Sequence, residues 1–265
     1  MKSWLVAGAL IGASLGFGAG PQVSGRAACP APDNEHRVAG QKECMAIRTF
    51  RPPSPVPNPI LIVYLHGDLS DGSPADYIYQ RAREAVADGR IVVAMLRPGY
   101  FDSEGNQSTG DNFDRNDSYT ASNVDAVAAA IQTLREYHKA SAVVVVGHSG
   151  GAAIAGVIIG RHPGLIDAAV LVACPCDVPA WRSGRRPWTR SLSPHDFVKK
   201  APADAKVTVI SGDRDDNVRP ALAKAYADNL AKRGISARFI LVPGAGHDDV
   251  MRKPELRAAL DQLVR

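Results

Sequence analysis

Residues 143–152, VVVVGHSGGA, combine an uninterrupted valine run, a glycine-rich turn and the start of a segment of small residues. Four consecutive valines predict a strand that is covered on both faces, because a strand with one face in water would alternate apolar and polar residues. Residues 152–159 are apolar all round, which predicts a deeply buried helix. A buried strand followed directly by a buried helix favours a parallel sheet with helices packed on it.

The same alternation of strand-like and helix-like segments continues on both sides of this stretch. Further strands are predicted at residues 60–65, 91–96, 168–172, 207–210 and 237–241, with an edge strand near 45–50. Helices are predicted at residues 75–88, 122–138, 219–232 and 254–264. Ser122 and Asp125 form a capping-box pattern at the start of the second of these helices. The sequence therefore predicts an α/β fold with a mostly parallel central sheet, helices on both faces and reactive residues at the carboxyl ends of strands.

The turn itself, Gly147-His148-Ser149-Gly150-Gly151, is a G-x-S-x-G pattern between the predicted strand and helix. A serine in this position sits on a sharp, strained turn that exposes its hydroxyl, and the flanking glycines keep Cβ atoms out of the turn. The dipole of the following helix favours negative charge there, and the Gly150 N–H can donate to an oxyanion. A chance match is disfavoured because both flanking elements are those the pattern requires. Ser149 is therefore the predicted nucleophile.

A serine nucleophile needs a base, and the base needs an acid that orients it. In this architecture the chain order is serine, then acid, then histidine, each in a loop after a strand. His247 follows the last predicted strand and is the candidate base. The loop after the preceding strand offers three candidate acids, Asp213, Asp215 and Asp216.

The sequence around these loops resembles a known group of enzymes. The chain resembles α/β-hydrolases, and residues 207–247 are most similar to the catalytic domains of prolyl oligopeptidase-type serine peptidases and dienelactone-hydrolase-like proteins. Those proteins carry Gly-x-x-Asp-x-x-Val after the corresponding strand, and Gly212 sets that register here. The resemblance implies that Asp215 is the acid, ahead of Asp213 and then Asp216.

The resemblance also implies where the second oxyanion donor lies. His66-Gly67 ends the first inner strand, and in these proteins the donor is the backbone N–H that follows such a pair. By position the donor is Asp68, with Leu69 as the alternative. We expect the Asp68 carboxylate to point away from the oxyanion. His66 and His148 are expected to shape the loop and to pack, respectively, rather than to act as bases.

These residues predict a serine hydrolase that cleaves ester or amide bonds through an acyl-enzyme and needs neither a metal nor an organic cofactor. Large oligopeptidases place a propeller ahead of the catalytic domain, for which this chain has no room. Ester hydrolysis is therefore placed ahead of a prolyl oligopeptidase-like activity on short peptides. The third alternative is a binding protein that has the α/β-hydrolase fold but no catalytic activity. The presence of Ser149, Asp215 and His247 together disfavours it.

Two segments are expected to shape the substrate pocket. Residues 175–204 form a predicted lid in which Trp181, Arg185 and Arg186 are candidates for binding a carboxylate or an aromatic group. A solvated basic turn is the alternative for this segment. Residues 98–118 carry several aspartates without the spacing of an EF-hand, and a solvated acidic loop is expected there.

Composition excludes other classes of protein. The chain has 265 residues, of which 45% are hydrophobic and 22% charged, so it is not a disordered protein. A formal net charge of +4 and the lack of a dense Lys/Arg stripe predict no nucleic-acid partner. The expected partner is a small ester or short peptide substrate, and the sequence does not give the oligomeric state.

The first 28 residues have the pattern of a secretory signal peptide. Lys2 supplies a positive start, residues 4–20 are apolar without charge, and small residues near 25–28 offer a cleavage point. Cleavage would leave a single α/β-hydrolase domain at residues 29–265, secreted or periplasmic and without a membrane span. A retained membrane anchor is the alternative, although about 17 apolar residues are short for a span.

Export would place the chain in an oxidising compartment, which permits its four cysteines to form disulfides. Cys29–Cys44 is the preferred pair because it would tie the N-terminal arm to the domain. Cys174-Pro175-Cys176 could close only a very tight ring, so the state of these two is left open. A metal site is not expected, because no second Cys/His pair lies at a ligand spacing.

Overall fold

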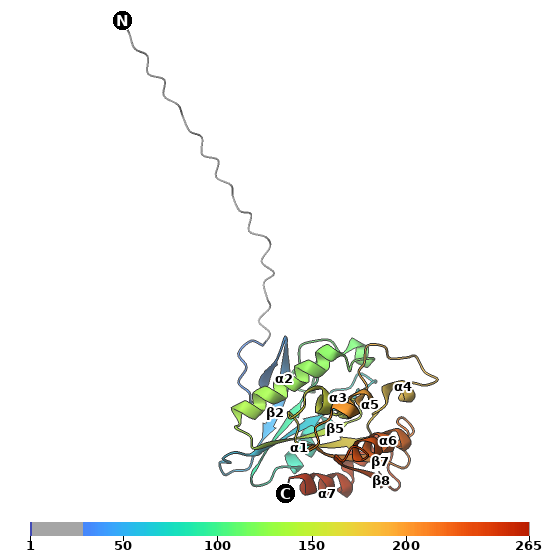
Figure 1. Cartoon of the computed structure of the whole chain (residues 1–265). Coiled ribbons are helices and arrows are strands. Elements are labelled where there is room, and N and C mark those ends of the chain that lie inside the picture. The colour runs from blue at the N-terminus through green and yellow to red at the C-terminus, as the bar shows by residue number, and fades with distance from the viewer. Residues whose placement is uncertain (2–28, 265) are drawn as a thin grey trace.

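The computed structural model describes Met1 and residues 29–264, which form one mixed sheet with helices on both faces (Figure 1). Eight strands are hydrogen-bonded in the order β1-β2-β4-β3-β5-β6-β7-β8. Their bounds are β1 (Arg37–Gly40), β2 (Glu43–Phe50), β3 (Ile60–Leu65), β4 (Arg90–Met95), β5 (Ala142–His148), β6 (Ala168–Val172), β7 (Lys206–Gly212) and β8 (Ser236–Val242). β2 pairs antiparallel with β1 and with β4, and all other neighbours are parallel, as the strand–helix alternation predicts.

The helices divide between the two faces of the sheet, and Figure 1 shows α2 and α7 on opposite sides. One face carries α2 (Ala121–Tyr137), α3 (Gly150–Arg161) and α6 (Pro220–Ala231), and the other carries α1 (Tyr77–Glu84) and α7 (Pro254–Leu263). The valine run of β5 explains this arrangement. Val143 and Val145 pack into the core beneath α2 and α3, whereas Val144 and Val146 pack into the core beneath α1 and α7. Both faces of β5 are therefore buried.

The remaining helical segments are short. They are the 3-10 helices η1 (Phe113–Arg115), η2 (Val198–Lys200) and η3 (Asp249–Arg252) and the single-turn helices α4 (Val178–Trp181) and α5 (Pro194–Phe197). Both α4 and α5 lie in the predicted lid, between β6 and β7.

The chain changes direction across the sheet between β3 and β5. β3 continues through α1 to β4 on one side, whereas β5 lies on the other side of β3 and continues through α3 on the opposite face. Leu65 at the end of β3 is the register partner of Gly147 in β5. Loops that leave neighbouring strand ends in opposite directions open a crevice, which is where ligands bind in sheets of this kind.

The turn after β5 is strained and closely packed. Ser149 has φ 50° and ψ −115°, a conformation that non-glycine residues rarely adopt. Its N–H donates to the Val172 carbonyl at 2.8 Å. A Cβ on Gly147 would lie 2.6 Å from the backbone of Ala152, and a Cβ on Gly151 would collide with the Leu65 carbonyl. The glycines on either side of Ser149 are thus required by close backbone contacts.

Two local predictions were wrong. β2 is the second strand of the sheet rather than its edge, because the four-residue β1 pairs with residues 43–46. Among the described residues, no strand pairs with the outer edge of residues 47–50, so the edge prediction was wrong only for the first part of the strand. The long helix α2 begins after Thr120, whose hydroxyl accepts a hydrogen bond from the Asn123 N–H, rather than at Ser122. Asp125, expected to complete a capping box, instead binds Arg161 on α3 at 2.7 Å. A tertiary ion pair therefore takes the side chain that the local pattern assigned to the helix end.

All four cysteines are disulfide-bonded. Cys29 pairs with Cys44, the first residue pair expected, and Cys174 pairs with Cys176 at the start of the lid. No helix in residues 29–264 has the length and apolar character needed to cross a bilayer. The predicted signal peptide at residues 1–28 lies almost wholly outside the residues that the structure describes.

Candidate active site

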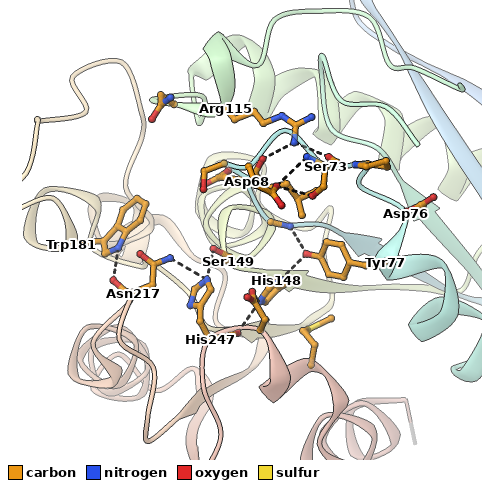
Figure 2. A pocket seen from close by; sticks show the side chains of 18 of the residues that line it. Asp68, Ser73, Asp76, Tyr77, Arg115, His148, Ser149, Trp181, Asn217 and His247 are labelled. Atoms are coloured by element: carbon orange, nitrogen blue, oxygen red, sulfur yellow. Dashed lines mark hydrogen bonds and ion pairs between the residues drawn. The ribbon is translucent and has the colours of Figure 1, made fainter. Parts of the chain in front are cut away.

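A cavity of about 930 Å³ lies at the carboxyl ends of the parallel strands, with Ser149 in its wall (Figure 2). The loop after β3, the start of α1, the lid and the loop after β8 all contribute residues to it. Figure 2 shows Trp181 and Asn217 on one side of Ser149 and Tyr77 and His148 on the other. The crevice created by the change of direction between β3 and β5 is therefore a substantial pocket.

Three of the predicted residues meet here, with Ser149 and His247 in the cavity wall and Asp215 buried behind His247. The Ser149 Oγ lies 3.0 Å from His247 Nε2, and His247 Nδ1 lies 2.9 Å from the nearer carboxylate oxygen of Asp215. An ionised carboxylate can only accept hydrogen bonds, so the Asp215 contact places the imidazole proton on His247 Nδ1. Nε2 is then free to accept a hydrogen bond from the serine hydroxyl. This is the tautomer that a histidine base needs in order to deprotonate a serine.

Among the three candidate acids, geometry favours Asp215. Its Oδ1 accepts N–H bonds from Asn217 at 3.1 Å and Val218 at 2.8 Å, so its own loop holds the carboxylate toward His247. Asp213 and Asp216 are exposed, and Asp213 accepts instead from the Gly244 N–H. A Cβ on Gly212 would collide with the Ala245 carbonyl, so glycine there lets the loops after β7 and β8 approach closely.

The environment of His247 favours its protonated form. Burial alone lowers the pKa of His247, but the hydrogen bond and the charge of Asp215 outweigh it and raise the pKa above its usual value. A protonated imidazole at this position is therefore stabilised by Asp215.

His148 joins three loops through hydrogen bonds. Its Nε2 donates to the His247 carbonyl at 3.1 Å, so Nδ1 is the acceptor for the Tyr77 hydroxyl at 2.7 Å. Tyr77 in turn accepts from the Gly67 N–H at 2.7 Å. Burial, and then the nearby His247, lower the pKa of His148 to about 4, which keeps the ring neutral. As expected from sequence, His148 is placed to support the site rather than to act as a second base.

The Asp68 carboxylate turns into the protein. Its two oxygens accept hydrogen bonds from Arg97 Nη2 at 2.7 Å and from the Tyr119 hydroxyl at 2.5 Å. Arg97 is buried, and although burial disfavours its charge, Tyr100 and Asp68 raise its pKa. A Cβ on Gly150 would collide with both Asp68 and Arg97, so the Asp68 loop is packed directly against the start of α3. The pair thus fixes the loop that carries the predicted second oxyanion donor.

Two further side chains hold the same loop. His66 accepts the Arg97 N–H at 2.9 Å through Nε2 and donates through Nδ1 to the Gly67 carbonyl at 2.7 Å, and burial lowers its pKa well below normal. This agrees with the expected structural role for His66. Arg115 donates to the carbonyls of Leu69, Ser73 and Gly72 at 2.6, 2.7 and 3.0 Å. The loop after β3 is therefore fixed at several points along its length.

The lid contributes an aromatic surface. Trp181 and Trp188 stack edge to face with ring centroids 5.0 Å apart, and Trp188 packs in the same way on Tyr119 at 5.1 Å. The Trp181 indole N–H donates to the Asn217 carbonyl at 2.9 Å. Trp181, Arg182 and Arg185 line the cavity. Arg185 and Arg186 are both exposed, but the predicted Arg186 lies outside the lining.

The aspartates of the 98–118 loop are partly structural. Asp117 is buried, and its carboxylate accepts the backbone N–H groups of Thr189, Arg190 and Ser191 in the lid. Asp102 is also buried and accepts from the Tyr79 hydroxyl at 2.9 Å. The expectation of a solvated acidic loop was therefore wrong for these two residues, because the lid and α1 supply donors that the local sequence does not reveal.

Several residues of the site carried no clear sequence signal. They are Tyr77, Arg97, Tyr119 and Asn217. Arg97 alone offered a hint, since it is a charged residue that directly follows an apolar strand. The others owe their place to tertiary contacts between segments far apart in the chain.

Comparison with known proteins agrees with this geometry. Residues 100–263, more than half of the chain, match the prolyl oligopeptidase family. The chain belongs to the prolyl oligopeptidase family. The matched region contains Ser149, Asp215 and His247. A search of curated protein sequences gives no match.

Solved structures support the same fold for this family member. Est1E from Butyrivibrio proteoclasticus, solved with ferulic acid bound, is 15% identical with a TM-score of 0.65, covering 86% of this chain and 99% of its own. Proline iminopeptidase from Mycobacterium smegmatis is 16% identical with a TM-score of 0.62, covering 86% and 96%. An esterase from Pyrobaculum calidifontis is 18% identical with a TM-score of 0.62, covering 86% and 81%. The protein is a serine hydrolase with the α/β-hydrolase fold.

Proposed function

We propose that Ser149, His247 and Asp215 are a catalytic triad that hydrolyses carboxylic esters through an acyl-enzyme. The observation that carries this proposal is the hydrogen-bonded chain from the Ser149 hydroxyl through His247 to the buried Asp215. A packing histidine would not require a buried carboxylate on one ring nitrogen and a serine hydroxyl on the other. The same chain disfavours a silent binding protein.

In the proposed acylation step, Ser149 Oγ attacks the ester carbonyl carbon while His247 Nε2 takes the hydroxyl proton. The carbonyl electrons move to oxygen, and the backbone N–H groups of Gly150 and Asp68 hold that oxyanion. Gly150 is the first residue of α3, so its N–H has no carbonyl one turn back in the helix. Each donor of this kind contributes about 10²–10³ in rate. His247 then gives the proton to the leaving alcohol as the C–O bond breaks.

Water completes the cycle. It attacks the acyl-enzyme as His247 takes one of its protons, and collapse of the second tetrahedral species releases the acid and restores the Ser149 hydroxyl. Asp215 stays ionised throughout and holds the imidazolium. No step uses a metal or an organic cofactor.

Peptide cleavage is the second candidate, because the family match is to prolyl oligopeptidases. The same three side chains and the same intermediates would serve an amide. Esters are placed first because several of the solved structures with this fold are esterases. Trp181 and Arg185 are proposed to contact the substrate in either case. The proposed signal peptide at residues 1–28 would deliver the domain to the periplasm or the exterior.

A fluorophosphonate probe and a substrate panel test the proposal. The wild-type protein should be labelled on Ser149 and should hydrolyse p-nitrophenyl esters faster than aminoacyl or prolyl p-nitroanilides. Labelling of a Ser149→Ala variant, or no labelling of the folded wild type, would overturn the triad. Faster cleavage of the prolyl amide would favour peptide cleavage over ester hydrolysis as the function.

A further inference from the structure

Two arginines of the lid face the cavity without a carboxylate partner. Within residues 29–264, neither Arg182 nor Arg185 takes part in an ion pair. Arg182 Nε donates to the Arg186 carbonyl at 3.0 Å, and Arg185 Nη1 donates to Asn217 Oδ1 at 3.3 Å. Most of the donors on the two guanidinium groups are therefore left for water or a ligand.

Two other arginines of the same cavity, Arg81 and Arg115, are already engaged. Arg81 pairs with Glu84 at 3.0 Å, and Arg115 is occupied by three backbone carbonyls. Arg252 also lines the cavity and takes part in no ion pair among the described residues, but it is exposed and lies outside the lid, in a segment that also contains Asp248 and Asp249. Arg182 and Arg185 differ because the four lid residues that line the cavity are two arginines and two tryptophans, with no acid among them.

The two tryptophans hold Arg182 in place. Its guanidinium carbon lies 5.2 Å from the Trp181 ring centroid and 5.1 Å from that of Trp188. A cation at this distance is attracted to the ring faces, and the Trp181 indole is itself tied to Asn217. The charge is thus carried on a fixed aromatic surface, which lowers the entropy lost when a ligand binds.

Arg182 and Arg185 also oppose one another electrostatically. Burial, and then the charge of Arg185, lower the pKa of Arg182 below its usual value. Tyr119 and the Asp117 carboxylate act on Arg182 in the opposite direction, but less strongly. A bound anion would relieve the remaining repulsion between the two guanidinium groups. Arginine donors in a planar fork suit a carboxylate, which can accept two parallel hydrogen bonds.

This arrangement is connected to the proposed chemistry. The Asn217 side chain accepts a hydrogen bond from Arg185 through Oδ1, and its Nδ2 lies 3.4 Å from His247 Nε2. His247 Nε2 is the atom that is hydrogen-bonded to the Ser149 hydroxyl. One side chain therefore separates Arg185 from the proposed base. A molecule that reaches from Ser149 to the lid would place its far end beside the two guanidinium groups.

We propose that Arg182 and Arg185 form a carboxylate-binding subsite, so that the preferred substrates are esters that carry a carboxylate beyond an apolar chain or ring. The inference rests on the proposed ester hydrolysis at Ser149 and adds the substrate class. Trp181 and Trp188 provide the apolar surface between the reacting carbonyl and the carboxylate.

The test compares two esters of the same length. The mono-p-nitrophenyl ester of adipic acid carries a carboxylate on the acyl chain, and p-nitrophenyl hexanoate is its neutral counterpart. A double variant, Arg182→Gln with Arg185→Gln, should raise KM for the adipate ester about tenfold, since each exposed ion pair is worth up to about a factor of five. KM for the hexanoate should change far less. Raising the salt concentration should weaken binding of the adipate ester only, and so raise its KM.

The matched control is Arg186→Gln, which removes a lid charge outside the cavity and keeps the backbone carbonyl that Arg182 binds. It should leave the ratio of the two KM values as in the wild type. A second pair, 4-carboxyphenyl butyrate and phenyl butyrate, places the carboxylate on the leaving group instead. If the double variant changes neither charged ester more than its neutral partner, the subsite does not exist.

Failure of the subsite can be separated from failure of the proposed hydrolysis. If the wild type cleaves none of these esters, the ester proposal fails, and binding is measured directly by titrating monomethyl adipate into Ser149→Ala. Binding that is lost in Ser149→Ala combined with the two glutamine substitutions supports the subsite. Equal binding with and without the arginines overturns it.

Discussion

The two sides of Ser149 differ in how their polar groups are satisfied. The hydrogen-bonded wall is formed by Gly67, Asp68, Tyr77 and His148, with Arg97 outside the cavity lining. It is mostly buried, and hydrogen bonds join its residues, although Arg97 Nε and Nη1 have no hydrogen-bond partner. The lid wall, formed by Trp181, Arg182, Arg185 and Trp188, carries two charges that take part in no ion pair with the described residues.

The contrast suggests a division of labour. Groups that are already paired have little left to offer a ligand, and they hold the reacting atoms in position before substrate arrives. Groups that are unpaired gain most from a ligand of opposite charge. The hydrogen-bonded wall is therefore expected to govern kcat, and the lid wall to govern KM and selectivity.

Ser149→Ala should have the largest effect, because both walls serve this one hydroxyl. We expect kcat on any ester to fall by about 10⁵–10⁶, with fluorophosphonate labelling abolished. Ser70→Ala is the matched control, since Ser70 also lines the cavity, and it should remain labelled. Substantial ester turnover by Ser149→Ala would show that Ser149 is not the nucleophile between the two walls.

Asp215→Asn should lower kcat by about 10⁴, because the amide no longer fixes the tautomer of His247 or stabilises its charged form. The pH profile gives a second readout. Activity rises as His247 loses its proton, and since Asp215 raises the pKa of His247, its removal should shift the acid limb to lower pH. Asp213→Asn, which changes an exposed carboxylate in the same loop, should leave the limb in place. An unshifted limb in Asp215→Asn would contradict the assignment.

Asp68→Asn should reveal how far the hydrogen-bonded wall depends on its buried ion pair. Removing the carboxylate charge leaves Arg97 buried and uncompensated, a change that costs about 3–5 kcal/mol in comparable cases. We expect lower stability in urea unfolding and a lower kcat in the folded fraction. Asp71→Asn alters an exposed acid of the same loop and should do neither.

Tyr77→Phe should have a smaller effect on turnover, with some loss of stability. It removes the donor to His148 and the acceptor for Gly67 while preserving the ring, and leaving buried polar groups unpaired costs about 1–3 kcal/mol each. We expect kcat to fall about tenfold with KM within twofold. Tyr79→Phe is the control, because its hydroxyl binds Asp102 instead. A change in KM alone would remove the distinction between the two walls.

Much of the fold was predictable from local pattern. The valine run of β5 and the apolar helix after it require burial on both faces, and that requirement leads directly to a parallel sheet. β1 was missed because Arg37–Gly40 is too short to show a period. The cap of α2 was misplaced because the Asp125 side chain is used by Arg161, a contact that exists only in the folded chain.

The candidate triad could be predicted because each member lies in a loop directly after a strand. The supporting network could not be predicted from the sequence. In the sequence Tyr77 is one aromatic residue of a helix, and only the folded sheet places Gly67 and His148 beside it. The choice between Arg182 and Arg186 shows the same limit. Both lie in one basic segment, and the path of the lid, rather than their spacing, decides which faces the cavity.

The two disulfides set practical conditions for preparing the enzyme. Correctly oxidised protein should be lighter by four hydrogen atoms in intact mass spectrometry than the same chain after reduction, which gives a simple check on each batch. Expression in a reducing cytosol would begin from four thiols, and mispairing between the arm at Cys29 and the lid at Cys174 would join segments that the native fold keeps apart. An oxidising host compartment, with alkylation of any residual thiol before assay, is the appropriate starting point.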